Sequence, residues 1–175
     1  MNAFAKIRFF FIISLIGVVL FSCDPNEKLP PETFLEFVNY RIINDTAMNL
    51  KVRFQKGNGN LGLDDRDTNP PFVGKYRNNL FIHVLDKQPD GTYAPMRIPI
   101  NNELWDTIIY SNRFPFLNTD PNSSVRGMID IPIPGGDFEP MQKHSELGWV
   151  KFEVYLYDRD LIRSNTVISP EIQIK

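Results

Sequence analysis

The stretch QKGNGNLGLDDRDTNPPF, residues 55–72, gathers side-chain oxygens that could bind a hard cation. Calcium takes about six to eight oxygen ligands, and loops that bind it usually hold several carboxylates at set positions. Counted in steps of two, the candidate ligands are Asn58, Asn60 and Asp64, but position 62 is a glycine and both asparagines are neutral. Asn and Gly also suit tight turns, because both tolerate positive φ angles. The spacing therefore predicts a structural loop that binds calcium weakly or not at all.

Acidic residues in this stretch and near the C-terminus could also serve glycoside hydrolysis, which needs a pair of carboxylates on either side of the scissile bond. The candidate acids are Asp64, Asp65, Asp67, Asp158 and Asp160. Acids in the turns between strands are ordinarily solvated turn formers, which is the simpler interpretation. A carboxylate-dependent polysaccharide hydrolase is therefore the alternative hypothesis for the function, and no residue is assigned a catalytic role.

The two histidines give little support for other kinds of catalysis. His83 lies in the run FIHVL, which favours a packed or hydrogen-bonded structural histidine. His144 lies in MQKHSEL, which reads as a polar connection where we expect exposure to solvent. Ser145 follows it, but sequence neighbours rarely form a nucleophile–base pair, and the chain has no G-x-S-x-G, H-E-x-x-H or phosphate-loop motif. We expect no cofactor.

Aromatic residues in the long connection Asn101–Ser124 are the best candidates for a binding site. Loops on a rigid scaffold often carry binding residues, and aromatic rings offer anchors for a protein partner or flat faces for sugars. The candidate ligand-binding residues are Trp105, Tyr110, Phe114 and Phe116. Alternatively, these rings form a small hydrophobic cluster that holds the connection on the domain. Tyr155 and Tyr157 occupy the other face of a predicted strand, which is equally consistent with an ordinary solvent-facing sheet.

The elements that must position these residues are β-strands. In residues 50–55 and 150–157, apolar and polar residues alternate with the period of two that is typical of half-buried antiparallel strands. Similar runs cover residues 34–43, 80–87, 93–100, 125–133 and 166–175. The pattern predicts an all-β fold, a single antiparallel immunoglobulin-like β-sandwich of about seven strands. Its expected core contains Val52, Phe54, Ile82, Val84, Val150, Phe152, Val154 and Leu156.

The N-terminus has the pattern of an exported protein. Lys6 and Arg8 precede an apolar run, residues 9–21, whose length is typical of a secretory signal and too short for a spanning helix. The run ends in LFSC, which resembles the lipobox of bacterial lipoproteins, and Cys23 is the only cysteine of the chain. The resemblance implies a signal peptide over residues 1–22 and lipid attachment at Cys23. A flexible, proline-containing tether then covers residues 23–33, and the sandwich domain covers residues 34–175.

The charge of the exported part narrows the range of partners. Residues 1–22 contain two of the 19 Lys and Arg residues and none of the 21 Asp and Glu residues, which leaves residues 23–175 with a formal charge of −4. This balance disfavours nucleic acid as a partner, because nucleic-acid binding requires basic surfaces. The expected partners are the membrane, through the lipid anchor, and an envelope protein or glycan.

Two segments carry a further resemblance. The C-terminal stretch FEVYLYDRDLIRSNTVISPEIQIK and the upstream pattern GNGNLGL…PPF…YRNNLFI resemble a group of Bacteroidota-type lipoproteins with an immunoglobulin-like domain. In that group the first segment commonly reads D-G-D-G-x-I-G-L, and a D-R-x-G-N-x-S-N turn joins the last two strands, where this chain has Leu161 and Ile162 in place of Gly-Asn. The resemblance implies an outer-membrane lipoprotein of the cell envelope, on either membrane face. We expect a lipid-anchored, non-enzymatic module that binds a partner protein or glycan.

Overall fold

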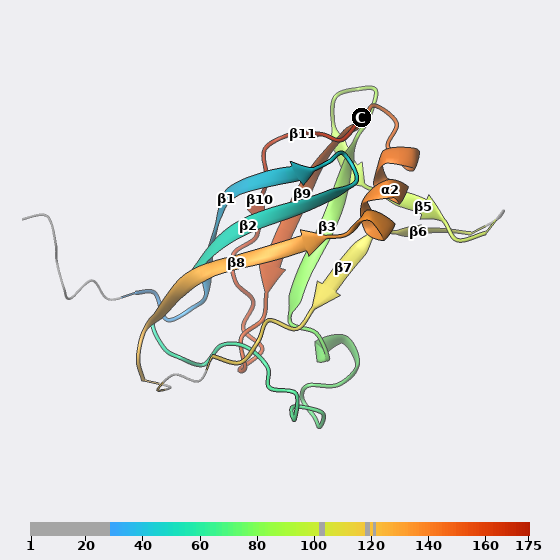
Figure 1. Ribbon diagram of the computed structural model, residues 1–175. Helices are drawn as coiled ribbons and strands as arrows, with labels where there is room; N and C mark the ends of the chain where they lie inside the picture. Colours follow the sequence, from blue (N-terminus) through green and yellow to red (C-terminus); the bar gives the residue numbers. More distant parts are fainter. Residues whose placement is uncertain (1–28, 102–103, 118–119, 121) are drawn as a thin grey trace, which may run out of the picture.

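The structure is a computed structural model that describes residues 29–101, 104–117, 120 and 122–175 (Figure 1). The predicted signal peptide, residues 1–22, and Cys23 lie outside the described residues. In this described part of the chain, no helix has both the length and the apolar character needed to cross a membrane.

Two antiparallel sheets face each other (Figure 1). The first, called the β2 sheet, has the order β1 (Phe34–Ile43), β2 (Ala47–Lys56) and β8 (Val125–Ile133). Its central strand pairs along its whole length on both sides, from Ala47 to Gln55 with β1 and from Met48 to Lys56 with β8. Residues of β2 are therefore fixed in register against both neighbours.

The second sheet, called the β9 sheet, is centred on β3 (Leu80–Lys87) and β9 (Trp149–Leu156), which pair with each other. On its other side, β9 pairs with two short strands, β10 (Val167–Ile168) and β11 (Ile172–Gln173). In the same way, β3 pairs on its other side with β4 (Tyr93–Pro95) and β7 (Ile109–Asn112). Two long strands in the middle of this sheet are thus flanked by pairs of short ones.

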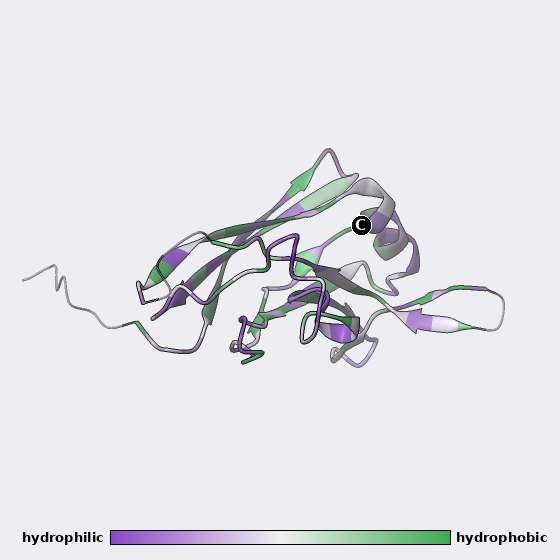
Figure 2. Cartoon of the chain, turned by 90° about the horizontal axis from the view of Figure 1, so that it is seen from below, coloured by the Kyte–Doolittle hydropathy of each residue, from purple (hydrophilic) through white to green (hydrophobic). Residues whose placement is uncertain are grey.

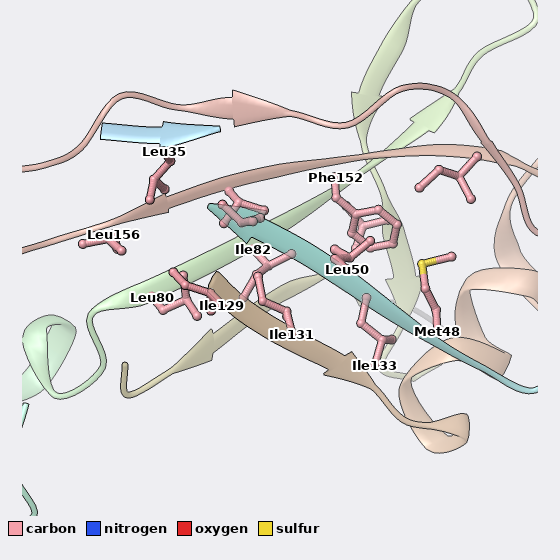
Figure 3. Packing of buried hydrophobic residues seen from close by; sticks show 14 of the residues in the cluster. Leu35, Met48, Leu50, Leu80, Ile82, Ile129, Ile131, Ile133, Phe152 and Leu156 are labelled. Atoms are coloured by element: carbon pink, nitrogen blue, oxygen red, sulfur yellow. The ribbon is translucent and has the colours of Figure 1, made fainter. Parts of the chain in front are cut away.

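Alternating burial along the strands builds one core between the two sheets (Figure 3). Every second side chain of β3 and β9 is buried, and the remaining side chains are half-buried on the outer face. Figure 2 shows hydrophobic and hydrophilic residues following one another along the strands. The eight predicted core residues are all buried, and they pack with residues of both sheets such as Leu50, Ile129 and Ile131. The predicted all-β antiparallel sandwich is therefore confirmed.

Prolines divide two of the predicted strands, because proline has no N–H group to donate to a strand ladder. Residues 93–100, predicted as one strand, form β4 and β5 (Arg97–Pro99) instead. Strand β5 leaves the β9 sheet and pairs with β6 (Trp105–Thr107) in a hairpin that projects from the sandwich (Figures 1 and 2). Near the C-terminus, Pro170 lies between β10 and β11.

Two predictions about connections are wrong. The segment 101–124 is not one continuous connection, because it contains β6 and β7. The stretch MQKHSEL is not a polar connection either, because helix α2 (Gly135–His144) includes its first four residues. The helix buries Phe138 and Met141, whose spacing of three places them on one helical face. The sequence does not predict this helix, because it contains two glycines and Pro140, and both residue types have low helix propensity.

A buried ion pair joins the ends of the two sheets. Lys56, the last residue of β2, places its Nζ 2.8 Å from Oδ2 of Asp158, and the two side chains are 1% and 0% exposed. Lys56 Nζ also donates to the carbonyl of Pro31 at 2.8 Å, while Asp158 Oδ1 accepts the backbone N–H groups of Asp160 and Ile162. The interpretation of Asp158 as a solvated turn former is therefore wrong, because its carboxylate is enclosed and neutralised by a lysine.

The N-terminal segment 29–33, which the sequence assigns to the tether, packs against this junction. Leu29 and Thr33 are buried, and the N–H of Gly57 donates to the carbonyl of Pro30. A Cβ atom at residue 57 would lie 2.6 Å from the carbonyl oxygen of Leu29, so only glycine permits this approach. The end of the sandwich where segment 29–33 lies is called the N-terminal end below.

Replacing Lys56 with methionine should lower the free energy of unfolding by about 3–5 kcal/mol, because the Asp158 carboxylate would stay buried without a counter-ion. Lys51→Met is the matched control: Lys51 forms an exposed pair with Asp130 at 3.4 Å, and its loss should cost less than about 1 kcal/mol. Urea unfolding measures both. Adding Asp158→Asn to Lys56→Met should restore part of the loss. Equal effects of the two single substitutions would contradict a buried, mutually dependent charge pair.

Candidate functional site

The outer face of the β9 sheet carries a group of aromatic side chains. Strand register places Phe81 of β3 opposite Tyr155 of β9, and His83 opposite Glu153. Because side chains alternate along a strand, these residues all point away from the core. The aromatic face, as we call this surface, consists of the half-buried residues Tyr76, Phe81, His83, Tyr93, Trp149, Tyr155 and Tyr157.

The rings near the N-terminal end of the aromatic face hold one another in place. Phe81 and Tyr155 stack with centroids 5.3 Å apart and planes 14° apart. Tyr157 meets both rings edge-on, at 5.9 Å from each, and Tyr76 meets Tyr157 edge-on at 5.5 Å. Pairs of this kind contribute about 0.5–1.5 kcal/mol each beyond the area they bury. These contacts therefore fix the orientation of the ring planes.

Polar and charged groups lie among these rings. His83 Nε2 is 3.3 Å from the hydroxyl of Tyr155, so the histidine is hydrogen-bonded as expected, although it faces outward. The guanidinium of Arg163 lies 3.8 Å from the centre of the Tyr155 ring. Partial burial raises the pKa of the Tyr155 hydroxyl, which stays a neutral donor at physiological pH. The surface thus alternates flat rings with hydrogen-bonding groups.

The far end of the aromatic face repeats this arrangement. Lys151 Nζ lies 4.2 Å from the ring centre of Tyr93, and Lys87 Nζ lies 5.6 Å from that of Trp149. Lys87 also pairs with Glu171 at 3.1 Å, and this hydrogen bond lowers the pKa of the Glu171 carboxyl. Burial, together with the nearby Glu171 carboxylate, raises the pKa of Tyr93 to about 12. Charged groups therefore flank the rings along the whole length of β9.

The four aromatic residues predicted to bind a ligand do not lie together. Trp105 is exposed on the β5–β6 hairpin, where its ring meets that of His144 edge-on at 6.3 Å. Tyr110 is half-buried beside α2 and donates to the carbonyl of Asp137 at 2.9 Å. Phe114 is buried in the core, and Phe116 is exposed toward Arg159. Proximity in the sequence did not predict a shared site, because Trp105 lies on β6, Tyr110 on β7, and Phe114 and Phe116 in the connection after β7.

The hydrogen bonds of Ser145 do not favour a nucleophile–base pair with His144. Ser145 is buried, and its hydroxyl donates to Asp86 Oδ1 at 2.6 Å and accepts the N–H of Gly148. His144 is half-buried against Trp105 rather than exposed, which corrects the prediction made for it. The Asp86–Ser145 hydrogen bonds therefore fix the start of β9.

Cations of the protein itself hold the acidic loop after β2. Arg159 donates to both carboxylate oxygens of Asp67, at 2.6 and 3.0 Å, and to the carbonyl of Gly62. Arg66 donates to both oxygens of Asp64. These hydrogen bonds keep the pKa values of Asp64 and Asp67 below the usual range of aspartate. Among the described residues, no three His, Cys, Asp or Glu side chains are grouped as a metal site would require.

The asparagines of the loop, proposed as weak calcium ligands, are used in turns and cross-links. Asn58 Oδ1 accepts the N–H of Asn60, which closes a local turn. The Asn60 amide donates to Asp160, a residue that follows β9. Three of the five acids considered for a hydrolase, Asp64, Asp67 and Asp158, are each bound to a basic side chain. The loop is therefore built as a structural connection between the two sheets.

Calcium at about 1 mM should leave the thermal midpoint unchanged relative to a chelator, because arginine side chains already compensate the loop carboxylates. A site of about 10 μM affinity would instead add about 2.7 kcal/mol and shift the midpoint by several degrees. Thermal melts monitored by circular dichroism make this measurement. A calcium-dependent rise that disappears in Asp64→Ala would overturn the structural interpretation of the loop.

Comparison with known proteins does not identify a family for this chain. A scan against protein-family models, a search of curated proteins and a search of solved structures each returned no match. The residues of the aromatic face and their surroundings are therefore the basis for assigning a function.

Proposed function

We propose that this chain is a lipid-anchored, non-enzymatic module of the cell envelope that binds a glycan through the aromatic face. The observation that carries this proposal is the group of rings on the outer side of β3 and β9, five of which, Tyr76, Phe81, His83, Tyr155 and Tyr157, contact one another. One face of an antiparallel sheet that meets solvent is normally polar. This surface instead carries several interlocked, half-buried rings on its two longest strands, and a binding role explains their place on the outer face.

A glycan suits this surface because the rings and the polar groups alternate over short distances. Sugar rings present flat apolar faces together with hydroxyl groups in every direction. Beside the rings, His83, Glu153 and the Tyr155 hydroxyl offer donors and acceptors to those hydroxyl groups. A partner protein, the other candidate left open by the sequence, usually needs a larger apolar centre that excludes water.

The tether proposed from the sequence suits this arrangement. Five residues separate Cys23 from Leu29, so the Cα atoms of these two residues are at most about 20 Å apart. A lipid on Cys23 would keep the N-terminal end of the sandwich close to the membrane. Strand β9 runs toward that end, so the aromatic face would extend away from the membrane along one side of the domain. A polymer lying over the envelope could reach it there.

The anchor is tested by Cys23→Ala, which should abolish labelling by a radioactive or clickable fatty acid and release the protein from the membrane fraction. Cleavage after residue 22 should stop as well, because lipidation would precede it. Lys28→Ala, a change in the tether itself, serves as the control and should be labelled normally. Normal labelling of the Cys23→Ala protein would contradict the lipoprotein assignment.

The binding surface is tested by affinity electrophoresis of the full chain in mild detergent, through gels that contain different polysaccharides. Tyr155→Ala should weaken retardation by the best polysaccharide about tenfold, because it removes a central ring and uncovers its neighbours. Trp105→Ala is the matched control at the hairpin and should change retardation less than about twofold. A thermal melt of each variant checks that the domain is folded.

The opposite pattern, in which Trp105→Ala abolishes retardation and Tyr155→Ala does not, would move the site to the hairpin. Retardation by no polysaccharide, together with capture of an envelope protein that depends on Tyr155, would replace the glycan by a protein partner.

A further inference from the structure

The two outer faces of the sandwich use their basic residues differently. On the β2 sheet, Lys51 lies 3.4 Å from Asp130, and Arg53 lies 2.8 Å from Glu36. Arg41 and Arg126 of the same sheet are exposed and form no ion pair among the described residues, and no cation of this sheet lies over an aromatic ring. On the aromatic face, Lys75, Lys151 and Arg163 each lie over an aromatic ring. None of these three forms an ion pair within the described part of the chain.

A ring attracts a cation through its quadrupole without cancelling the charge. The cations over the aromatic face therefore keep their full charge toward a ligand, while their side chains are held in fixed positions. The aromatic face has four basic residues, Lys75, Lys87, Lys151 and Arg163, against two acids, Glu153 and Glu171. The outer face of the β2 sheet has the same balance, with four basic residues against Glu36 and Asp130, so the aromatic face differs from it in holding its cations over rings rather than in net charge.

Resting on the proposed function, we infer that the ligand is an anionic polysaccharide, whose sugar units carry carboxylate or sulfate groups. Sugar rings would lie on Phe81, Tyr157 and Trp149, and the acid groups would meet Lys151 and Arg163. Complementary charge of this kind contributes mainly to specificity and to the rate of association.

The spacing of the cations indicates a polymer rather than a single sugar. Arg163 lies over Tyr155, four residues along β9 from Lys151, which corresponds to about 13 Å. One sugar unit with one acid group cannot reach both cations. An extended chain that follows β9 can place successive acid groups near each of them.

The wide spacing of charges on the aromatic face also favours an anionic polysaccharide over nucleic acid as the ligand. A nucleic-acid strand carries a charge at every nucleotide and is bound by dense basic surfaces. The aromatic face includes Glu153 opposite His83 at its centre, and Glu171 at its far end, and both would repel closely spaced phosphates. A polysaccharide with fewer, separated acid groups avoids them.

The test uses the full acylated chain in neutral detergent and isothermal titration at about 50 and 300 mM salt. The probes are polygalacturonate and alginate as carboxylated chains, dextran sulfate as a sulfated chain, and dextran, laminarin and xyloglucan as neutral chains. A single-stranded oligonucleotide of thymidine is included as well. We expect at least one anionic polysaccharide to bind, with Kd rising about tenfold or more at the higher salt, and the neutral chains to bind at least tenfold more weakly.

The variants make the test specific to this face. Lys151→Ala and Arg163→Ala should each raise Kd about five- to tenfold and reduce the dependence on salt, whereas Arg163→Lys should retain most of the binding. Lys51→Ala and Arg53→Ala remove the same charge from the opposite sheet and should change Kd less than about twofold.

Each other outcome would overturn the inference. Salt-independent binding of a neutral chain that is lost in Tyr155→Ala would leave the proposed function standing and refute the anionic ligand. Equal losses in the Lys51→Ala and Lys151→Ala proteins would indicate non-specific attraction of polyanions. Tighter binding of the oligonucleotide would replace the polysaccharide by nucleic acid, and binding of no polysaccharide at all would refute the proposed function as well.

Discussion

The buried ion pair between Lys56 and Asp158 is the constraint on which the rest of the structure depends. Two charges removed from water are tolerated only where they meet each other and where hydrogen bonds satisfy their remaining atoms. Here this requires the end of β2, the turn after β9 and the backbone of Pro31 to come together at one point. The pair thereby fixes the two sheets relative to each other at the N-terminal end. It also fixes the direction in which the turn after β9 continues toward Arg163.

The aromatic face follows from that arrangement. Its central rings stand on β3 and β9, the two long strands in the middle of their sheet, and their positions are set by backbone pairing on both sides. A site built on central strands is held more accurately than one built on loops, because its side chains inherit the rigidity of the sheet. The ring contacts stabilise the surface and leave its rings partly exposed, so the same side chains serve packing and the recognition that we propose. Trp105 on the projecting two-stranded hairpin and Phe116 in the connection after β7 lack this support.

The strands and the core could be predicted from the sequence because a period of two is a local signal. Phe152 and Val154 were placed inward by alternation alone, and both are buried. The aromatic face needs more than a local signal, because Phe81 and Tyr155 become neighbours only through strand register across 74 residues of chain. The burial of Asp158 could not be predicted from the sequence either, because its partner Lys56 lies on the other sheet. Helix α2 was missed because two glycines and a proline obscure a stripe of only two buried residues.

The outer strands of the β9 sheet are short, and this affects how copies of the domain can associate through their sheet edges. An exposed sheet edge is a template on which a second chain can add a strand, and an apolar, aromatic sheet would make such association more harmful. The strands β10 and β11, separated at Pro170, offer two residues each along one edge of the β9 sheet, and β4 and β7 offer three and four along the other. No continuous run of free backbone groups remains on these strands for another copy to extend. The β2 sheet differs, because its edge strands β1 and β8 have ten and nine residues and each pairs within the sheet with β2 alone. Strand addition by another copy is therefore expected at the β2 sheet rather than at the aromatic β9 sheet.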